Sequence, residues 1–393
     1  MHYSLRLLVL AVATLAWLAG GELRAQGVPG VSSKEIVIGS CSALEGPSHA
    51  LGTQQVKGAQ AYFNLINDQG GVDGRKLRLV AYDDSYDPAK TETCFKRLQS
   101  QNVFAMGFFV GTPTAVKYLP MAEEAKIPLV GLFTGAQTLY TPLRRWIINV
   151  RASYGDETRE QVEGLWKGLG YRKIAVIYPE DAFGAAVLDG VKAALKSKGA
   201  EPVATGTYPR QTAEADAAIQ AARSKDPDAV VIVGPANTVG PIVKKAHAQG
   251  WRPMFVTVSF VGTDDLILQA GADADGMVVT QVVPPYYLTD LKTVALYRKT
   301  FAQYAPGEEP GFVSLEGFVN AMVMVEGLKR AGKDLTREGL IRGIESIHQM
   351  DLGLGPQLLL NYSARDHQGF DAVIPTVIRS GRAVPFTDWN TAK

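Results

Sequence analysis

The run Gly-Thr-Pro-Thr at positions 111–114 is the part of this chain best suited to hold a small anion. It follows residues 103–110, an apolar stretch typical of a strand buried on both faces of a parallel sheet. Thr112 stands at an expected N-cap and Pro113 at an expected first helical position. Such a helix start offers hydroxyls and backbone N–H groups without intrahelical acceptors, which favour negative charge. The alternative is that Thr112 only caps the helix, a role worth about 1 kcal/mol.

A second turn of small residues, 134–136, follows another apolar run at 127–133. Ligands of open α/β sheets bind outside the carboxyl ends of the parallel strands. We therefore expect both turns to border one cleft.

Alternating strand and helix patterns surround these turns. We expect strands near 36–38, 76–82, 103–110 and 127–133, and a second set near 173–178, 229–233, 253–258 and 277–283. Helical patterns separate them, which indicates parallel sheets covered on both faces. Because 393 residues exceed the usual size of one core, we predict two lobes.

Composition and charge narrow the function. The composition is 46% hydrophobic and 20% charged, as in ordinary globular proteins. A formal net charge of +1 excludes nucleic-acid binding as the main function, because there is no basic excess to neutralise phosphates.

The N-terminus predicts export. Arg6 precedes an apolar run at 7–19, and a cleavage region ends at Ala25. We interpret residues 1–25 as a signal peptide and the mature protein as periplasmic; an uncleaved anchor is the alternative. In an exported protein the two cysteines, Cys41 and Cys94, would form a disulfide or remain as buried thiols.

Several runs together resemble a known family. They are 67–75 (Asn-Asp-Gln-Gly-Gly-Val-Asp-Gly-Arg), Asp83-Asp84, Asp87-Pro88, the strand ending in Gly-Thr-Pro-Thr, 149–153, 178–184 and 314–317. Their order and spacing resemble the Leu/Ile/Val-binding proteins, the type I periplasmic solute-binding proteins of ABC transporters. The resemblance implies an α/β fold of two Rossmann-like (flavodoxin-like) lobes with parallel central sheets, joined by a three-segment hinge. Lobe 1 would comprise 34–150 plus 284–353, and lobe 2 would comprise 151–283 plus 354–393.

The same resemblance suggests the ligand contacts. In the family the turns after the third and fourth strands hold the ligand carboxylate; the matching residues here are Gly111, Thr112, Thr114, Phe133, Thr134 and Gly135. Phe183 stands where family members place an aromatic ring over the ligand, and Tyr154 follows the first crossing. Either ring could instead belong to the core. Arg151 could pair with a ligand carboxylate or form an ion pair in the hinge.

One departure from the family bears on the ligand. Many amino-acid binders in the family place a carboxylate at the end of a second-lobe strand to hold the ligand ammonium. Here that strand is followed by Ser259 and Phe260, two candidate contacts, and acidic residues appear only at Asp264 and Asp265. A desolvated ammonium without a partner is costly. We therefore expect a small carboxylate without an α-amino group, aromatic or branched.

No catalytic signature accompanies these residues. The chain has no phosphate-binding loop, no Gly-x-Ser-x-Gly and no Cys-x-x-Cys, and its histidines lack metal-ligand spacing. We expect no enzyme activity, no cofactor and no metal. The resemblance implies a monomer that delivers its ligand to the membrane subunits of an ABC permease. The alternative is a periplasmic sensor that reports the ligand to a membrane kinase or chemoreceptor.

Overall fold

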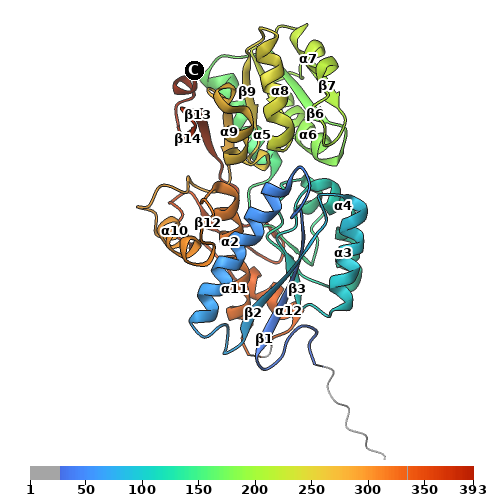
Figure 1. Ribbon diagram of the computed structural model, residues 1–393, viewed down its shortest axis with the longest axis vertical. Helices are drawn as coiled ribbons and strands as arrows, with labels where there is room; N and C mark the ends of the chain where they lie inside the picture. The colour runs from blue at the N-terminus through green and yellow to red at the C-terminus, as the bar shows by residue number, and fades with distance from the viewer. Residues whose placement is uncertain (1–26, 334) are drawn as a thin grey trace, which may run out of the picture.

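The structure, a computed structural model, describes residues 27–333 and 335–393. The predicted signal peptide, residues 1–25, lies outside the described residues. Two lobes lie one above the other, and the chain crosses between them (Figure 1). None of the helices within the described ranges is long and apolar enough to cross a bilayer.

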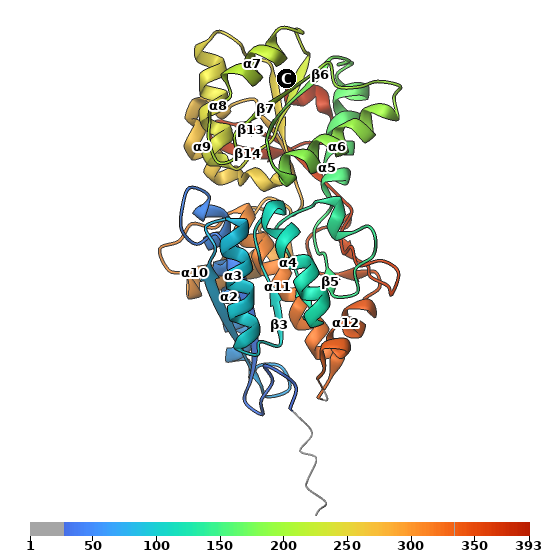
Figure 2. The ribbon, with the colours of Figure 1, turned by 90° about the vertical axis from the view of Figure 1, so that its right-hand side faces the viewer.

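Lobe 1 is built on a parallel sheet of order β2-β1-β3-β4-β5. The strands are β1 (Glu35–Ser42), β2 (Lys76–Asp83), β3 (Ala105–Gly107), β4 (Leu129–Val130) and β5 (Ile147–Ile148). The helices are α2 (His49–Asp68), α3 (Pro88–Ser100), α4 (Thr112–Ala125), α10 (Lys292–Tyr304), α11 (Phe312–Ala331) and α12 (Arg337–Glu345). Helices α2, α10, α11 and α12 cover one face and α3 and α4 the other (Figures 1 and 2). Helix α11 is buried along most of its length, which fits its apolar sequence.

Lobe 2 repeats the pattern with a sheet of order β14-β13-β10-β9-β8-β6-β7. Its strands are β6 (Ile174–Pro179), β7 (Ala204–Tyr208), β8 (Ala229–Ile232), β9 (Met254–Thr257), β10 (Val278–Gln281), β13 (Ile374–Arg379) and β14 (Arg382–Pro385). Its helices are α5 (Tyr154–Glu163), α6 (Ala182–Lys196), α7 (Asp216–Arg223), α8 (Ala236–Ala248) and α9 (Thr263–Ala270). Strands β13 and β14 are antiparallel, so the expectation of parallel sheets holds for the central strands and not for this edge. The sequence patterns did not indicate β7 and α7.

The third crossing lies later than expected. The family resemblance predicts that residues 354–370 belong to lobe 2, but Leu358, Leu360 and Phe370 pack in the core of lobe 1. Strand β11 (Met350–Asp351) pairs with β12 (Leu359–Leu360), and the hydroxyl of Tyr362 donates to the carbonyl of Asn149 at 3.0 Å. The chain returns to lobe 2 just before β13, because the apolar side chains of this segment are buried against the first lobe.

Of the two alternatives for the cysteines, the structure shows the disulfide. Cys41 in β1 and Cys94 in α3 are joined by a disulfide, with Cα atoms 6.0 Å apart. The bond ties the first strand to the helix that follows the second strand.

Candidate functional site

The start of α4 lies at the carboxyl end of the lobe 1 sheet, facing lobe 2. Gly111, not Thr112, is the N-cap, with φ of 95°, a left-handed conformation that glycine tolerates. A methyl group on Gly111 would also collide with the ring of Tyr86. The predicted cap was therefore wrong by one residue, and the side chain of Thr112 is released from a capping role.

The hydroxyls of Thr112 and Thr134 meet at this helix start, 2.7 Å apart, and both residues are buried. Helix geometry leaves the N–H groups of Thr112 and Thr114 without an intrahelical acceptor. The hydroxyl of Thr114 instead donates to the carbonyls of Val110 and Gly111, so only its backbone is available to a ligand. Threonine hydroxyls and free N–H groups are suited to hold an anion, and this helix start is called the candidate anion seat, or seat, below.

Aromatic rings from both lobes enclose this seat. The ring centroid of Phe260 lies 5.2 Å from that of Phe133 in lobe 1 and 4.4 Å from that of Phe183 in lobe 2. Tyr154 lies 5.3 Å from Phe183, and Tyr86 lies 5.9 Å from Phe260. All five rings are buried. The anion seat therefore lies in an apolar enclosure, where its hydrogen bonds are strengthened by the low local dielectric.

The first crossing passes close to the seat. The N–H of Tyr154 donates to the carbonyl of Gly135 at 2.7 Å, and a methyl group on Gly135 would collide with Tyr154. Ser153 caps α5 with its side chain and forms a capping box with Asp156. Glycine at 135 is thus required by the close approach of the second lobe to the turn.

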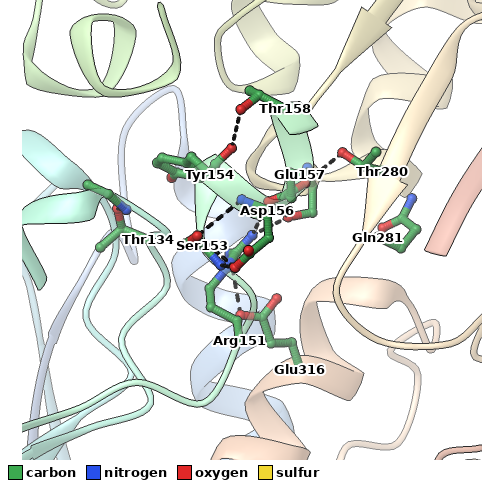
Figure 3. Close-up of polar contacts among 12 residues, drawn as sticks. Thr134, Arg151, Ser153, Tyr154, Asp156, Glu157, Thr158, Thr280, Gln281 and Glu316 are labelled. Atoms are coloured by element: carbon green, nitrogen blue, oxygen red, sulfur yellow. Dashed lines mark hydrogen bonds and ion pairs between the residues drawn. The ribbon is translucent and has the colours of Figure 1, made fainter. Parts of the chain in front are cut away.

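Arg151 forms a buried ion-pair cluster in the hinge, drawn in Figure 3. Its guanidinium lies 3.0 Å from Glu157 of α5 and 3.4 Å from Glu316 of α11. Burial raises the pKa of Glu316 to about 7, although Arg151 offsets part of this effect. Of the two roles considered for Arg151, the structure shows the ion pair in the hinge.

Ser259 belongs to the same cluster. Its N–H donates to Glu157 at 2.7 Å, its hydroxyl donates to Glu157 at 2.9 Å, and Arg151 also contacts that hydroxyl. A carboxylate, Glu157, therefore does reach the end of β9, but Arg151 neutralises it. This leaves the seat without an evident counter-ion on that side for a ligand ammonium.

The family of this chain is shown by its similarity to known proteins. Residues 35–382 match a family model described as periplasmic binding protein. The chain belongs to this family. A possible leucine/isoleucine/valine-binding protein from Rhodopirellula baltica SH 1 is 31% identical and superposes with a TM-score of 0.86, covering 93% of this chain and 99% of that one. An amino acid binding protein from Pseudomonas aeruginosa is 25% identical over 308 residues, 76% of this chain and 79% of the relative. The Leu/Ile/Val-binding protein of Escherichia coli K12 is 22% identical over 250 residues, 63% of this chain and 68% of the relative.

These likenesses confirm the predicted type I fold of two α/β lobes. The relatives are solute-binding proteins rather than enzymes, and the family is periplasmic. Within the described residues, no group of three or more His, Cys, Asp or Glu side chains is placed to hold a metal ion.

In this periplasmic binding protein, most of the candidate residues lie together at the junction of the lobes: Thr112, Phe133, Thr134, Tyr154, Phe183 and Phe260. Gly111 and Gly135 allow close approach, whereas the hydroxyls of Thr114 and Ser259 are used elsewhere.

Sequence reasoning missed Tyr86, Arg210 and Glu157. Arg210, which follows β7, stacks over the ring of Tyr86 with its Cζ 4.5 Å from the centroid, and also donates to the carbonyl of Tyr86. No local pattern marks these residues, because they come from segments distant in sequence. Glu316 could have been chosen as a candidate from the sequence, since it lies in the run 314–317, which is part of the family resemblance.

Proposed function

We propose that this protein is the solute-binding component of an ABC importer of the branched-chain amino-acid type. It would capture a small carboxylate between its lobes and present the closed form to a membrane permease. The observation that carries the proposal is the Thr112–Thr134 hydroxyl pair at the start of α4, buried beneath aromatic rings from both lobes. The similarity to an amino acid binding protein and to a Leu/Ile/Val-binding protein supports the same class.

The ligand we propose is a carboxylate without an α-amino group. The carboxylate that reaches the end of β9, Glu157, is paired with Arg151 at 3.0 Å. Releasing Glu157 for a ligand ammonium would break this buried ion pair and leave Arg151 with Glu316, 3.4 Å away, as its remaining carboxylate partner, which is a costly rearrangement of buried charges. One solved relative by fold, from Thermomonospora curvata, is described as a fatty acid ABC transporter substrate-binding protein.

A thermal-shift screen of amino acids, aromatic acids and branched carboxylic acids tests the binding step. A ligand at about 100 times its dissociation constant should stabilise the protein by about 2.7 kcal/mol. Thr112→Val should abolish most of that shift, because it removes one of the two paired hydroxyls. Thr238→Val in lobe 2, whose hydroxyl donates to Pro235, is the matched control and should keep the shift. An unchanged shift in Thr112→Val would exclude this residue from the site.

Uptake measurements test the transport step. Deleting the protein should abolish high-affinity import of the ligand found in the screen, because the permease depends on the closed lobes. Normal uptake together with a lost transcriptional or chemotactic response would instead favour the sensing function.

A further inference from the structure

Three buried phenol hydroxyls border the seat. They belong to Tyr86 in the loop after β2, Tyr118 in α4 and Tyr154 at the start of α5. Each residue is at most 1% exposed, and none of the three phenol hydrogens is donated to an acceptor among residues 27–333 and 335–393, although Arg210 lies beside the Tyr86 hydroxyl and Thr134 beside the Tyr154 hydroxyl. A buried polar group left unpaired costs about 1–3 kcal/mol of stability. A bound ligand that accepts hydrogen bonds from all three hydroxyls would remove this cost.

Tyr86 and Tyr154 are placed against the seat by the two glycines. The ring of Tyr86 lies on Gly111, the N-cap of α4, and that of Tyr154 lies on Gly135. The Thr134 hydroxyl is close enough to the phenol of Tyr154 to oppose the rise in its pKa that burial causes. In Figure 3 the ring of Tyr154 extends toward the turn that carries Thr134.

Tyr118 reaches the same place from within α4. Side chains of a helix point back toward its N-terminus, so Tyr118, four residues after Thr114, is directed to the seat. Its ring packs edge-on against Phe109, with centroids 4.8 Å apart. Burial raises the pKa of Tyr118, and the charges of Asp84 and Tyr154 raise it further.

The donors at the seat outnumber the acceptor sites of a plain carboxylate. The backbone N–H groups of Thr112 and Thr114, at least one hydrogen of the Thr112–Thr134 pair and three phenol hydrogens give about six donors. A carboxylate offers about four lone-pair sites. A second oxygen on the ligand would use the surplus donors.

We infer that the site takes an α-oxo or α-hydroxy acid, and that the hydroxyls of Tyr86, Tyr118 and Tyr154 bind its oxygens. This inference rests on the proposed function and goes further by naming the chemical group beside the carboxylate. The three tyrosines act as neutral donors, so they favour oxygen over an ammonium at that position. The apolar remainder of the ligand contacts the rings of Phe133, Phe183 and Phe260.

Isothermal titration with four compounds of equal skeleton tests the inference: leucine, and the α-oxo, α-hydroxy and unsubstituted acids with leucine's side chain. The α-oxo or the α-hydroxy acid should bind at least about tenfold tighter than the unsubstituted acid, since a hydrogen bond of about 1.4 kcal/mol gives that factor. Equal binding of these acids overturns the inference while leaving the proposed function standing. Tightest binding of leucine also overturns it, because the tyrosine hydroxyls are proposed to favour oxygen over an ammonium at that position. No binding of any of the four compounds overturns the inference, and the proposed function falls with it only if the thermal-shift screen also finds no carboxylate ligand.

Tyr118→Phe gives the second measurement. It keeps the ring against Phe109 and removes only the hydroxyl, so folding should be retained. The advantage of the α-oxo or α-hydroxy acid should fall to about threefold or less, while the affinity for the unsubstituted acid stays within about twofold. Tyr208→Phe in lobe 2, whose hydroxyl already donates to the carbonyl of Val233, is the control and should keep the full advantage. An undiminished advantage in Tyr118→Phe would exclude its hydroxyl from the site and overturn the inference for this residue.

Discussion

Glu316 carries the least compensated charge of the hinge cluster. Glu157 takes the shorter contact with Arg151 and accepts further hydrogen bonds from Ser259 and from Thr280 at 2.7 Å. Glu316 lies 3.4 Å from Arg151 and is buried. One arginine thus faces two carboxylates in a dry environment. The penalty falls on Glu316, whose pKa rises to about 7, first through burial and then through the charge of Glu157.

Glu316→Gln should remove this penalty in a pH-dependent way. The folded state has the higher pKa, so between about pH 4.5 and 7 it binds more protons than the unfolded chain. The contribution of Glu316 to stability therefore falls as pH rises through that window. Glutamine cannot ionise, so the variant avoids this loss. Its free energy of unfolding relative to the wild type should rise by about 2–3 kcal/mol from about pH 5 to about pH 8. Urea denaturation at both pH values measures the difference, and the exposed Glu309→Gln is the control. A difference that does not change with pH would contradict the assignment.

At the scale of elements, the geometry of the start of α4 depends on Gly111 before it and on the neighbouring loops. Gly111 supplies a backbone conformation that a β-branched residue would strain, and the turn after β4 brings Thr134 to the same point. The neighbouring element α3 is tied to β1 by the disulfide, which fixes the two elements on either side of the β2 strand and its following loop, where Tyr86 lies. The seat therefore depends on three loops fixed at one end of one sheet.

Replacing both cysteines of the disulfide by alanine should destabilise lobe 1. The bond closes a sequence separation of 53 residues, for which the chain-entropy model gives about 4 kcal/mol. Urea denaturation of the wild type and of the double variant measures the loss. Reduced wild type should behave like the variant, whereas equal midpoints for oxidised and reduced protein would show that the bond contributes nothing.

At the scale of the whole molecule, contacts between the lobes extend beyond the aromatic rings. The hydroxyl of Ser48 lies 3.3 Å from Oδ1 of Asn237, and Asp264 in α9 accepts from the N–H of Phe312 at 2.9 Å. Arg210 spans the same gap: it pairs with Asp181 at 3.1 Å in its own lobe and contacts Tyr86 in the other. These polar links favour the closed arrangement in which the seat is covered.

Arg210→Ala should shift the protein toward open lobes. It removes a cation stacked on Tyr86 and a hydrogen bond to the Tyr86 carbonyl. A larger radius of gyration by small-angle scattering is expected, and an apparent dissociation constant about tenfold higher, because the binding-competent fraction falls. Arg172→Ala, which removes a stacking contact with Trp166 inside lobe 2, should change neither quantity. Identical scattering from Arg210→Ala and wild type would contradict this role.

The sequence alone determined the two-lobe α/β architecture and predicted where the seat would lie, because buried strands, helix starts and small-residue turns are local patterns. It placed Thr112, Thr134 and Phe183 among the candidates for the same reason. Only the tertiary structure decided that Gly111 is the cap, that residues 354–370 stay with lobe 1, and that Arg151 pairs with Glu157 and Glu316. It alone placed the ring of Tyr86 against Gly111 and the ring of Tyr154 against Gly135. Such groupings depend on which loops meet between two lobes, and no short-range pattern in a chain encodes contacts between segments so far apart.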